Sequence, residues 1–118
     1  MTLDTTPPWE DVQNYVGGSW QSPSGDGGED VIDPATGETV SHVSFSSAAD
    51  VDEAVAAGRE AFETWRSTPV EERIQPLFEL KQLLETHQEE LAEVLVREHG
   101  KTFGEAMGEL RRGIENKR

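Results

Sequence analysis

Gly100-Lys101-Thr102 is the segment of this 118-residue sequence that most resembles a site of chemistry, because it matches the end of a phosphate-binding loop. Such a loop also needs an earlier glycine, at the place where Leu95 stands here, and a strand before it. The residues that precede Gly100 instead have helical periodicity. The sequence therefore does not predict nucleotide binding at this segment.

Other groups that could do chemistry show no catalytic or metal-binding pattern. His42, His87 and His99 are not spaced as metal ligands, and no sequence pattern pairs them with acids. Acid pairs such as Glu71-Glu72 and Glu89-Glu90 fall on the outsides of predicted helices, which favours a solvated surface over acid–base catalysis. There is no cysteine, which excludes disulfides, thiolate metal sites and thiol catalysis. We predict no catalytic and no cofactor-binding residue.

Composition predicts a polar domain with a thin core. The chain is 34% hydrophobic and 29% charged, with 24 acidic and 10 basic residues and a net charge of −14. This balance argues against binding to nucleic acid or to an anionic membrane. Dispersed acids with few lysines favour a salt-loving origin, with an ordinary acidic bacterial protein as the alternative. Neither a signal peptide nor a membrane span is visible, and we expect a soluble, cytoplasmic protein.

A stripe of apolar residues between Val70 and Thr102 is the main organising feature of the sequence. Its spacing of three and four predicts two consecutive helices over residues 69–86 and 88–98, whose apolar face needs a partner to cover it. The stripe consists of Ile74, Leu77, Phe78, Leu80, Leu83, Leu84, Leu91, Val94, Leu95 and Val96.

Helix ends are also marked in this stretch. Thr68 is expected to cap the first helix, with Pro69 at its first position and Glu71 reaching back to the cap. Because Pro76 would lie inside that helix, we expect either a kink there or a helix that begins two turns later. Gly100 is expected to close the second helix.

The amino-terminal third predicts a small antiparallel β layer after a loose lead-in at residues 1–11. Two short strands between Asn14 and Trp20 flank the turn Gly17-Gly18, and strands at 29–33 and 38–44 flank a proline–glycine turn. We expect the aromatic residues to serve core and hairpin packing. They are Trp9, Trp20, Phe62, Trp65, Phe78 and Phe103.

Two further helices have capping signatures. Ser47 and Asp50 open one predicted over residues 48–66, and Thr102 and Glu105 open another that runs to the end of the chain. Because the last helix shows no stop signal, we expect its partner surface to lie beyond residue 118. The predicted fold class is α+β, with a hairpin layer followed by about four helices.

Several of these pieces together resemble the amino-terminal part of the aldehyde dehydrogenase superfamily. They are YVGGSW, DPATGE, the helix pattern DVDEAVAAGREAFETW and the helix end REHGKT. Within the superfamily, the stretch EHGKTFGEAMGEL is most similar to methylmalonate-semialdehyde dehydrogenases. The resemblance implies that residues 12–118 are part of an NAD(P)-binding cofactor domain. It also implies a nucleophilic cysteine and cofactor motifs elsewhere, since none occurs here.

The resemblance also implies a monovalent cation site. Many family members bind such a cation through backbone carbonyls before an asparagine–proline turn and through an acid just before the glycine of the G-K-[TP] motif. The matching residues here are Val31, Ile32 and Glu98. Asp33 replaces the usual asparagine, and Glu98 is longer than the aspartate common in the family, so a local cap or ion pair of Glu98 is the alternative.

Two hypotheses follow. In the first, the chain is an amino-terminal segment of an NAD(P)-dependent aldehyde dehydrogenase, inactive alone, whose partner is the remainder of that enzyme or its oligomer. In the second, it is a stand-alone helical interaction module, or one half of a split dehydrogenase, that binds through its exposed stripe.

Overall fold

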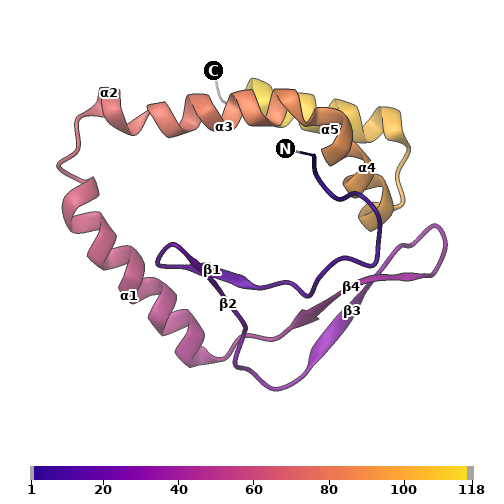
Figure 1. Cartoon of the computed structure of the whole chain (residues 1–118), viewed down its shortest axis with the longest axis horizontal. Coiled ribbons are helices and arrows are strands. Elements are labelled where there is room, and N and C mark those ends of the chain that lie inside the picture. The colour runs from indigo at the N-terminus through magenta and orange to yellow at the C-terminus, as the bar shows by residue number, and fades with distance from the viewer. Residues whose placement is uncertain (1, 117–118) are drawn as a thin grey trace.

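The computed structural model describes residues 2–116, in which two β-hairpins and five helices lie around an open middle (Figure 1). Each hairpin is an antiparallel two-stranded sheet of its own. The predicted α+β class is confirmed, although the β layer is divided in two because the polar loop at residues 22–27 separates the hairpins.

The first hairpin joins β1 (Asn14–Val16) to β2 (Ser19–Gln21). Gly17 and Gly18 have φ angles of 59° and 84°. These left-handed values fit a two-residue hairpin turn, and glycine adopts them without strain. Tyr15 and Trp20 are cross-strand partners whose ring centroids are 4.9 Å apart. The predicted glycine hairpin is therefore confirmed.

The second hairpin joins β3 (Gly28–Ile32) to β4 (Thr39–Ser44). Asp33 stabilises the turn between β3 and β4. Its backbone N–H donates to the Glu38 carbonyl at 2.9 Å, and its carboxylate accepts from the Ala35 N–H at 2.8 Å. The Asp33 side chain is buried, at 4% exposure, so this short-range hydrogen bond satisfies a polar group that would otherwise be costly.

The pairing of β3 with β4 is irregular between Val31 and Ile32. Their partners on β4 lie two residues apart and leave Val40 unmatched, as in a β-bulge. Val40 is 2% exposed, and its carbonyl accepts a hydrogen bond from the Trp9 N–H at 2.7 Å. The irregularity thus leaves Val40 as an extra residue on β4, and its side chain is part of the small core.

Helix α1 (Ala48–Trp65) begins with the predicted capping box. The Ser47 N–H donates to the Asp50 carboxylate at 2.7 Å, and the Asp50 N–H donates to the Ser47 hydroxyl at 3.2 Å. This reciprocal pair satisfies two amides that a helix start leaves free. The prediction of a helix over residues 48–66 is confirmed to within one residue.

Helices α2 (Val70–Arg73) and α3 (Gln75–Thr86) replace the single helix predicted over residues 69–86. The predicted cap at Thr68 is wrong, because Pro69 occupies the N-cap position and the Thr68 hydroxyl donates back to the Thr64 carbonyl at 3.3 Å. A threonine hydroxyl just after a helix can donate to the carbonyl four residues earlier, and this bond competes with capping the next helix. Of the two alternatives for Pro76, the later start is confirmed, since proline stands in the first turn of α3, where its missing N–H has no cost.

Helices α4 (Gln88–His99) and α5 (Phe103–Glu115) pack against each other and form most of the core. Within the described residues, the buried apolar side chains are Val40, Ala92, Ala106 and Ile114. The predicted break between 86 and 88, the Gly100 cap and the box formed by Thr102 and Glu105 are all confirmed. Residues 117 and 118 of the last predicted helix lie outside the described part.

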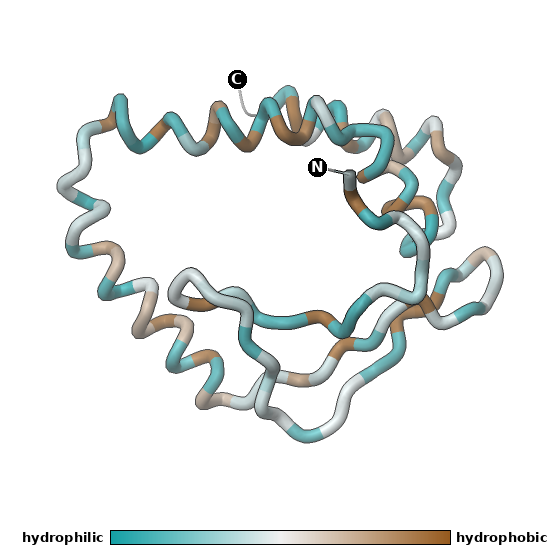
Figure 2. Tube along the Cα trace, in the orientation of Figure 1, coloured by the Kyte–Doolittle hydropathy of each residue, from teal (hydrophilic) through white to brown (hydrophobic). Residues whose placement is uncertain are grey.

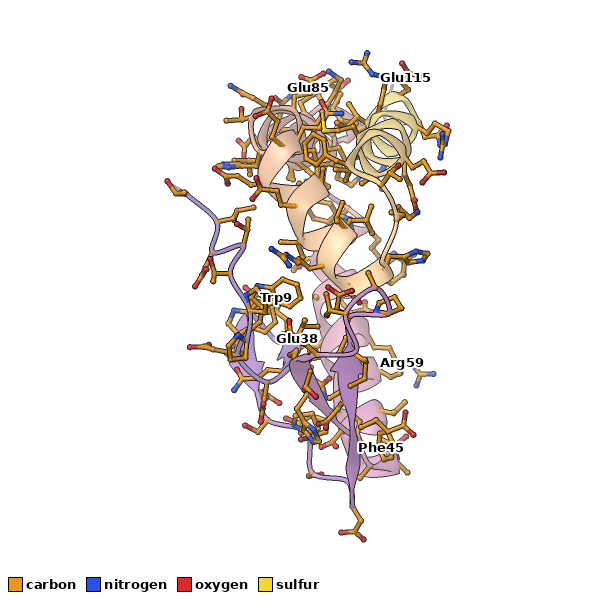
Figure 3. The ribbon with its side chains drawn as sticks, turned by 90° about the vertical axis from the view of Figure 1, so that its right-hand side faces the viewer. Trp9, Glu38, Phe45, Arg59, Glu85 and Glu115 are labelled. Atoms are coloured by element: carbon orange, nitrogen blue, oxygen red, sulfur yellow. The ribbon has the colours of Figure 1, made fainter. Side chains whose placement is uncertain are left out.

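The predicted lead-in runs from α4 to β4 and makes specific contacts. The Leu3 N–H donates to a carboxylate oxygen of Glu90 at 2.9 Å, and the Trp9 N–H donates to the Val40 carbonyl. Figure 3 shows Trp9 at the level where the helices meet the strands. A single parallel bridge ties the chain just after it to β4. Residue 1 lies outside the described range, and the domain boundary at residue 11 stays a prediction.

The arrangement leaves an unusually large surface exposed. Its radius of gyration is 17.2 Å, whereas a compact domain of this length has about 13.5 Å. Its accessible surface is 8784 Å², against roughly 6,300 Å² for a compact protein of this mass. Helices α1, α2 and α3 contain no buried residue at all. The chain thus leaves on the order of 2,400 Å² uncovered that a closed domain would bury.

Apolar residues recur along these three helices, as the colouring of the trace in Figure 2 shows. Those that are large and exposed are here called the uncovered helical face. The face consists of Val51, Val55, Phe62, Trp65, Val70, Ile74, Leu77, Phe78, Leu80 and Leu83. The expectation that the aromatic residues form a core is wrong for Phe62, Trp65, Phe78 and Phe103, which are 46 to 57% exposed. Periodicity identified the apolar faces of the helices, but no element within residues 2–116 buries the residues of the uncovered helical face. No helix within residues 2–116 is long and apolar enough to cross a membrane.

Candidate functional site

Gly100, Lys101 and Thr102 form the connection between α4 and α5, and each has a structural partner. Gly100 has a φ of 72°, the left-handed value that closes α4. The Lys101 ammonium forms an ion pair with Glu109 and lowers the pKa of that carboxyl. The Thr102 hydroxyl accepts the Glu105 N–H as a helix cap. The segment that resembled a phosphate loop therefore acts as a turn between helices.

Two of the three histidines pair with acids, which the sequence analysis missed. His42 Nδ1 lies 2.9 Å from Asp30 across the second hairpin, and His87 Nδ1 lies 2.9 Å from Glu90 in the first turn of α4. The expectation that Glu90 is only solvated is also wrong, because it binds the Leu3 N–H as well. That N–H, followed by His87, lowers the pKa of Glu90. The helical spacing of His87 and Glu90 could have revealed one pair.

Asp50 is the carboxylate whose titration is most perturbed. It accepts the backbone N–H groups of Ser24 at 2.9 Å and of Ser47 at 2.7 Å, together with the Ser24 hydroxyl at 2.7 Å. These donors, with the Ser24 N–H first, lower the pKa of Asp50 to about 2. Asp50 is thus ionised at neutral pH and links the polar loop to the start of α1. Its carboxylate oxygens already accept these hydrogen bonds, which fits a structural role.

The three residues predicted to bind a cation lie on elements whose ends meet. Val31 and Ile32 end β3, and Glu98 is in the last turn of α4. The ends approach because Gly100 contacts the turn after β3, where a Cβ added to Gly100 would be 2.7 Å from the Pro34 Cγ. Within residues 2–116, no three acidic or histidine side chains form a metal-binding group. A cation at this junction would therefore depend on backbone carbonyls.

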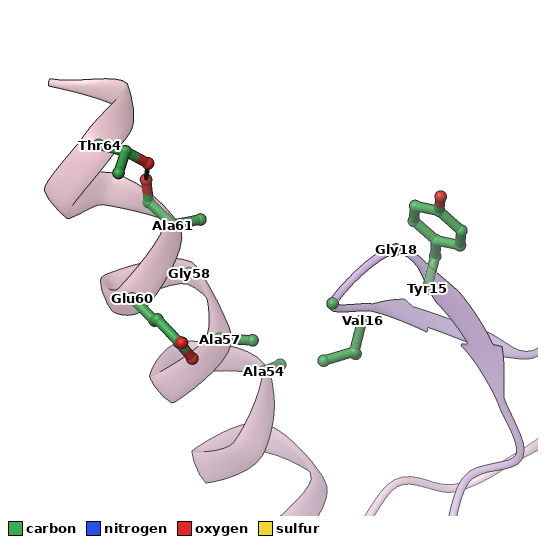
Figure 4. Close-up of a pocket in the computed structure, with 10 residues that line it drawn as sticks. Tyr15, Val16, Gly18, Ala54, Ala57, Gly58, Glu60, Ala61 and Thr64 are labelled. Carbon is green, nitrogen blue, oxygen red and sulfur yellow. Dashed lines mark hydrogen bonds between the residues drawn. The ribbon is translucent and has the colours of Figure 1, made fainter. Parts of the chain in front are cut away.

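A groove of about 710 Å³ separates the first hairpin from α1 (Figure 4). The α1 wall presents mainly small residues, namely Ala54, Ala57, Gly58 and Ala61. Figure 4 shows Val16 pointing toward Ala54 and Ala57, whereas the Tyr15 ring points away from them. The Thr64 hydroxyl donates to the Ala61 carbonyl at 3.2 Å and is already used within the helix. A wall of small side chains suits close packing of another apolar element better than acid–base chemistry.

A family model described as the aldehyde dehydrogenase family matches residues 20–118, which is most of the chain. The chain belongs to the aldehyde dehydrogenase family. It is 49% identical over 104 residues to malonate-semialdehyde dehydrogenase 2 of Geobacillus kaustophilus, which covers 88% of this chain and 22% of that relative. This member of the aldehyde dehydrogenase family thus spans about a fifth of the length of the curated relative.

Solved aldehyde dehydrogenases contain the same arrangement of hairpins and helices. Methylmalonate-semialdehyde dehydrogenase from Oceanimonas doudoroffii matches with a TM-score of 0.85 and 37% identity, over 92% of this chain and 22% of that one. Aldehyde dehydrogenase C from Pseudomonas syringae, in complex with NAD⁺ and octanal, also matches with a TM-score of 0.85 and 37% identity, over 90% of this chain and 22% of that one. The predicted likeness to the aldehyde dehydrogenase superfamily and to methylmalonate-semialdehyde dehydrogenases is confirmed.

Proposed function

We propose that this chain serves as the amino-terminal, cofactor-domain segment of an NAD(P)-dependent dehydrogenase that oxidises malonate or methylmalonate semialdehyde to an acid or acyl-CoA. The observation that carries the proposal is the 49% identity to a malonate-semialdehyde dehydrogenase across nearly the whole chain. In such an enzyme a cysteine attacks the aldehyde, and hydride passes to the nicotinamide. This chain has no cysteine, so its role is structural support for residues supplied by the remainder of the enzyme.

The residues of this segment do not fit the pyrophosphate of NAD(P). Helices α1 and α5 carry Asp50 and Glu105 in their first turns. Each of these carboxylates already accepts the backbone N–H of its N-cap residue. The first turn of α4 carries Glu89 and Glu90. Because a helix start binds phosphate through free amides and positive potential, a carboxylate in the first turn opposes that binding. The cofactor is therefore assigned to the part of the enzyme outside this chain.

Activity of separated and reassembled parts tests this function. The purified 118-residue chain should form no NADH or NADPH with methylmalonate semialdehyde at any salt concentration. Joined in one polypeptide to the complementary part of the Geobacillus relative, it should support oxidation of methylmalonate semialdehyde in preference to octanal. Turnover by the isolated chain would reject the proposal. A joined enzyme that folds but oxidises neither malonate semialdehyde nor methylmalonate semialdehyde would also reject it.

The junction of β3 with α4 supports a second proposal, a monovalent cation held by the carbonyls of Val31 and Ile32 and the carboxylate of Glu98. The pairing of β3 with β4 is irregular between Val31 and Ile32, so the ladder is interrupted beside these two carbonyls. The carbonyl end of α4 adds partial negative charge, and Glu98 is exposed beside it.

Thermal unfolding at constant ionic strength tests the cation site. Replacing tetramethylammonium by K⁺ should raise the Tm of the unaltered chain and of Glu89→Gln, an exposed acid at the other end of α4. It should leave the Tm of Glu98→Gln unchanged. Equal shifts in Glu98→Gln and Glu89→Gln would show that K⁺ does not use Glu98.

We also propose a working environment of high salt, supported by the net charge of −14, and a cytoplasmic location. Activity of the joined enzyme should rise as KCl is increased from about 0.1 M toward about 2 M, where screening is nearly complete. A constant or falling activity over that range would reject the salt requirement.

The uncovered helical face favours a second candidate function, in which the chain is a separate interaction module or one half of a split dehydrogenase. The DNA downstream of codon 118 distinguishes the two. A continuing dehydrogenase reading frame supports one long enzyme, whereas a stop codon followed by a companion gene supports a split one.

A further inference from the structure

The uncovered helical face has the composition of a protein interior rather than of a surface. Its residues on α1 recur at helical spacing, and Phe62 and Trp65 remain 55% and 47% exposed. On α3, Leu77 and Phe78 are 51% and 57% exposed. Exposed apolar patches larger than a few hundred Å² mark interaction sites in soluble proteins.

The size of the exposed surface indicates a permanent partner. The surplus of on the order of 2,400 Å² on this chain alone already reaches the area that obligate interfaces bury on both partners together. Weak electron-transfer complexes and some transient signalling complexes bury less than about 1,200 Å² in total. A small substrate, or a partner of that kind, would leave much of this surplus in water.

A second copy of this chain fits poorly as that partner. Each copy carries a net charge of −14, so two copies would repel one another wherever salt does not screen the charge. By contrast, solved chains several times longer contain the same arrangement with a TM-score of 0.85. The open arrangement is therefore compatible with the presence of the other four-fifths of such a chain.

We propose that the uncovered helical face is a docking surface for the complementary part of an aldehyde dehydrogenase, and that it binds this part even when the two are separate polypeptides. The proposal rests on the proposed function for the identity of the partner. The groove between the first hairpin and α1 lies on the same helix, and its small-residue wall also allows close approach of an apolar element. Phe62, Leu77 and Phe78, which are 51 to 57% exposed, serve as anchors of the face in this proposal.

Co-expression with a shortened relative tests the docking. The partner is the Geobacillus malonate-semialdehyde dehydrogenase 2 without the 104 residues that match this chain, and the complex is measured by affinity capture and by mass in solution. We expect equal numbers of the two polypeptides in the complex. The variant Phe62→Gln/Leu77→Gln/Phe78→Gln should bind about 100-fold more weakly, as expected when central apolar anchors are removed.

A matched control and a local probe complete the experiment. Phe45→Gln changes a phenylalanine outside the face that is 44% exposed and should bind as the unaltered chain does. In a Trp9→Phe/Trp20→Phe background, Trp65 is the remaining tryptophan, and its emission should shift to shorter wavelength on docking. The triple variant should keep the circular dichroism of the parent, because all three side chains are already exposed.

The shortened relative is also joined covalently to this chain, so that poor folding of the separate partner does not obscure the result. In the joined protein Trp65 should again shift. A folded joined protein in which Trp65 stays exposed, homodimers of this chain alone, or equal binding by the triple variant would each overturn the proposal. A stable complex without aldehyde oxidation would reject the proposed function while leaving the docking surface in place.

Discussion

Removing negative charge should have the same effect on folding as adding salt. The net charge is −14 and the radius of gyration is 17.2 Å. Relative to an unfolded chain with a radius of gyration of about 35 Å, these charges disfavour the compact state by about 4 kcal/mol at 0.1 M salt. At 1 M salt the same repulsion falls to about 1.5 kcal/mol, so screening stabilises the folded chain by about 2.5 kcal/mol.

Five exposed acids were chosen for neutralisation: Asp52, Glu60, Glu71, Glu89 and Glu93. Glu90 is excluded because it holds the Leu3 N–H and His87. Changing the five to asparagine or glutamine takes the net charge from −14 to −9. Because repulsion scales with the square of the charge, it falls to about two-fifths, again a gain of about 2.5 kcal/mol at 0.1 M salt.

Far-ultraviolet circular dichroism during a KCl titration measures this effect. The unaltered chain should show weak helical signal in dilute buffer and gain helix between about 0.1 and 2 M KCl. The neutralised variant should reach the same signal at lower salt. A control that exchanges aspartate and glutamate at the same five positions keeps the charge and should titrate like the parent. A salt-insensitive spectrum, or a neutralised variant that needs more salt, would refute charge repulsion as the limiting term.

Three substitutions test single contacts. Gly100→Ala should lower stability by more than about 1 kcal/mol in chemical denaturation, because it combines a positive φ with a clash against Pro34; an unchanged midpoint would contradict this. Asp50→Asn should lower the Tm at pH 7. Since the pKa of Asp50 is lowered from 3.8 to about 2, the carboxylate contributes fully at pH values well above 4, and its contribution is lost as the pH falls through 2, so the difference in Tm between parent and variant should narrow over that range; a difference of constant size from pH 7 to pH 2 would rule this out. Glu90→Gln should speed amide exchange at Leu3 by roughly tenfold, as expected for the loss of a charge-assisted hydrogen bond; equal exchange in parent and variant would count against the tie.

The features predicted correctly from the sequence are those determined by neighbouring residues. The box of Ser47 and Asp50, the cap at Gly100 and the turn at Gly17-Gly18 each depend on residues at most four apart, so short-range chemistry decides them. Thr68 was misassigned because its hydroxyl donates to the Thr64 carbonyl at the end of α1 and does not cap the start of α2.

Contacts between distant parts of the chain were not accessible to the sequence. Glu90 binds Leu3 across 87 residues, and nothing in either neighbourhood marks the pair. Periodicity placed Phe62 and Phe78 on apolar faces. It could not show that both side chains stay exposed among the described residues 2–116. For the candidate site, the resemblance selected Val31, Ile32 and Glu98, whereas the contact of Gly100 with Pro34 explains why their elements meet.

The uncovered helical face also has a consequence in time. Synthesis proceeds at about 5–20 residues per second, so an enzyme of which this segment is 22% would need on the order of 20–70 s more for its remaining residues to be made. Throughout that interval the segment would stand at the ribosome with Phe62, Trp65 and Phe78 in water. Until the rest of the enzyme covers the face, neighbouring nascent chains on a polysome would expose the same apolar residues to one another.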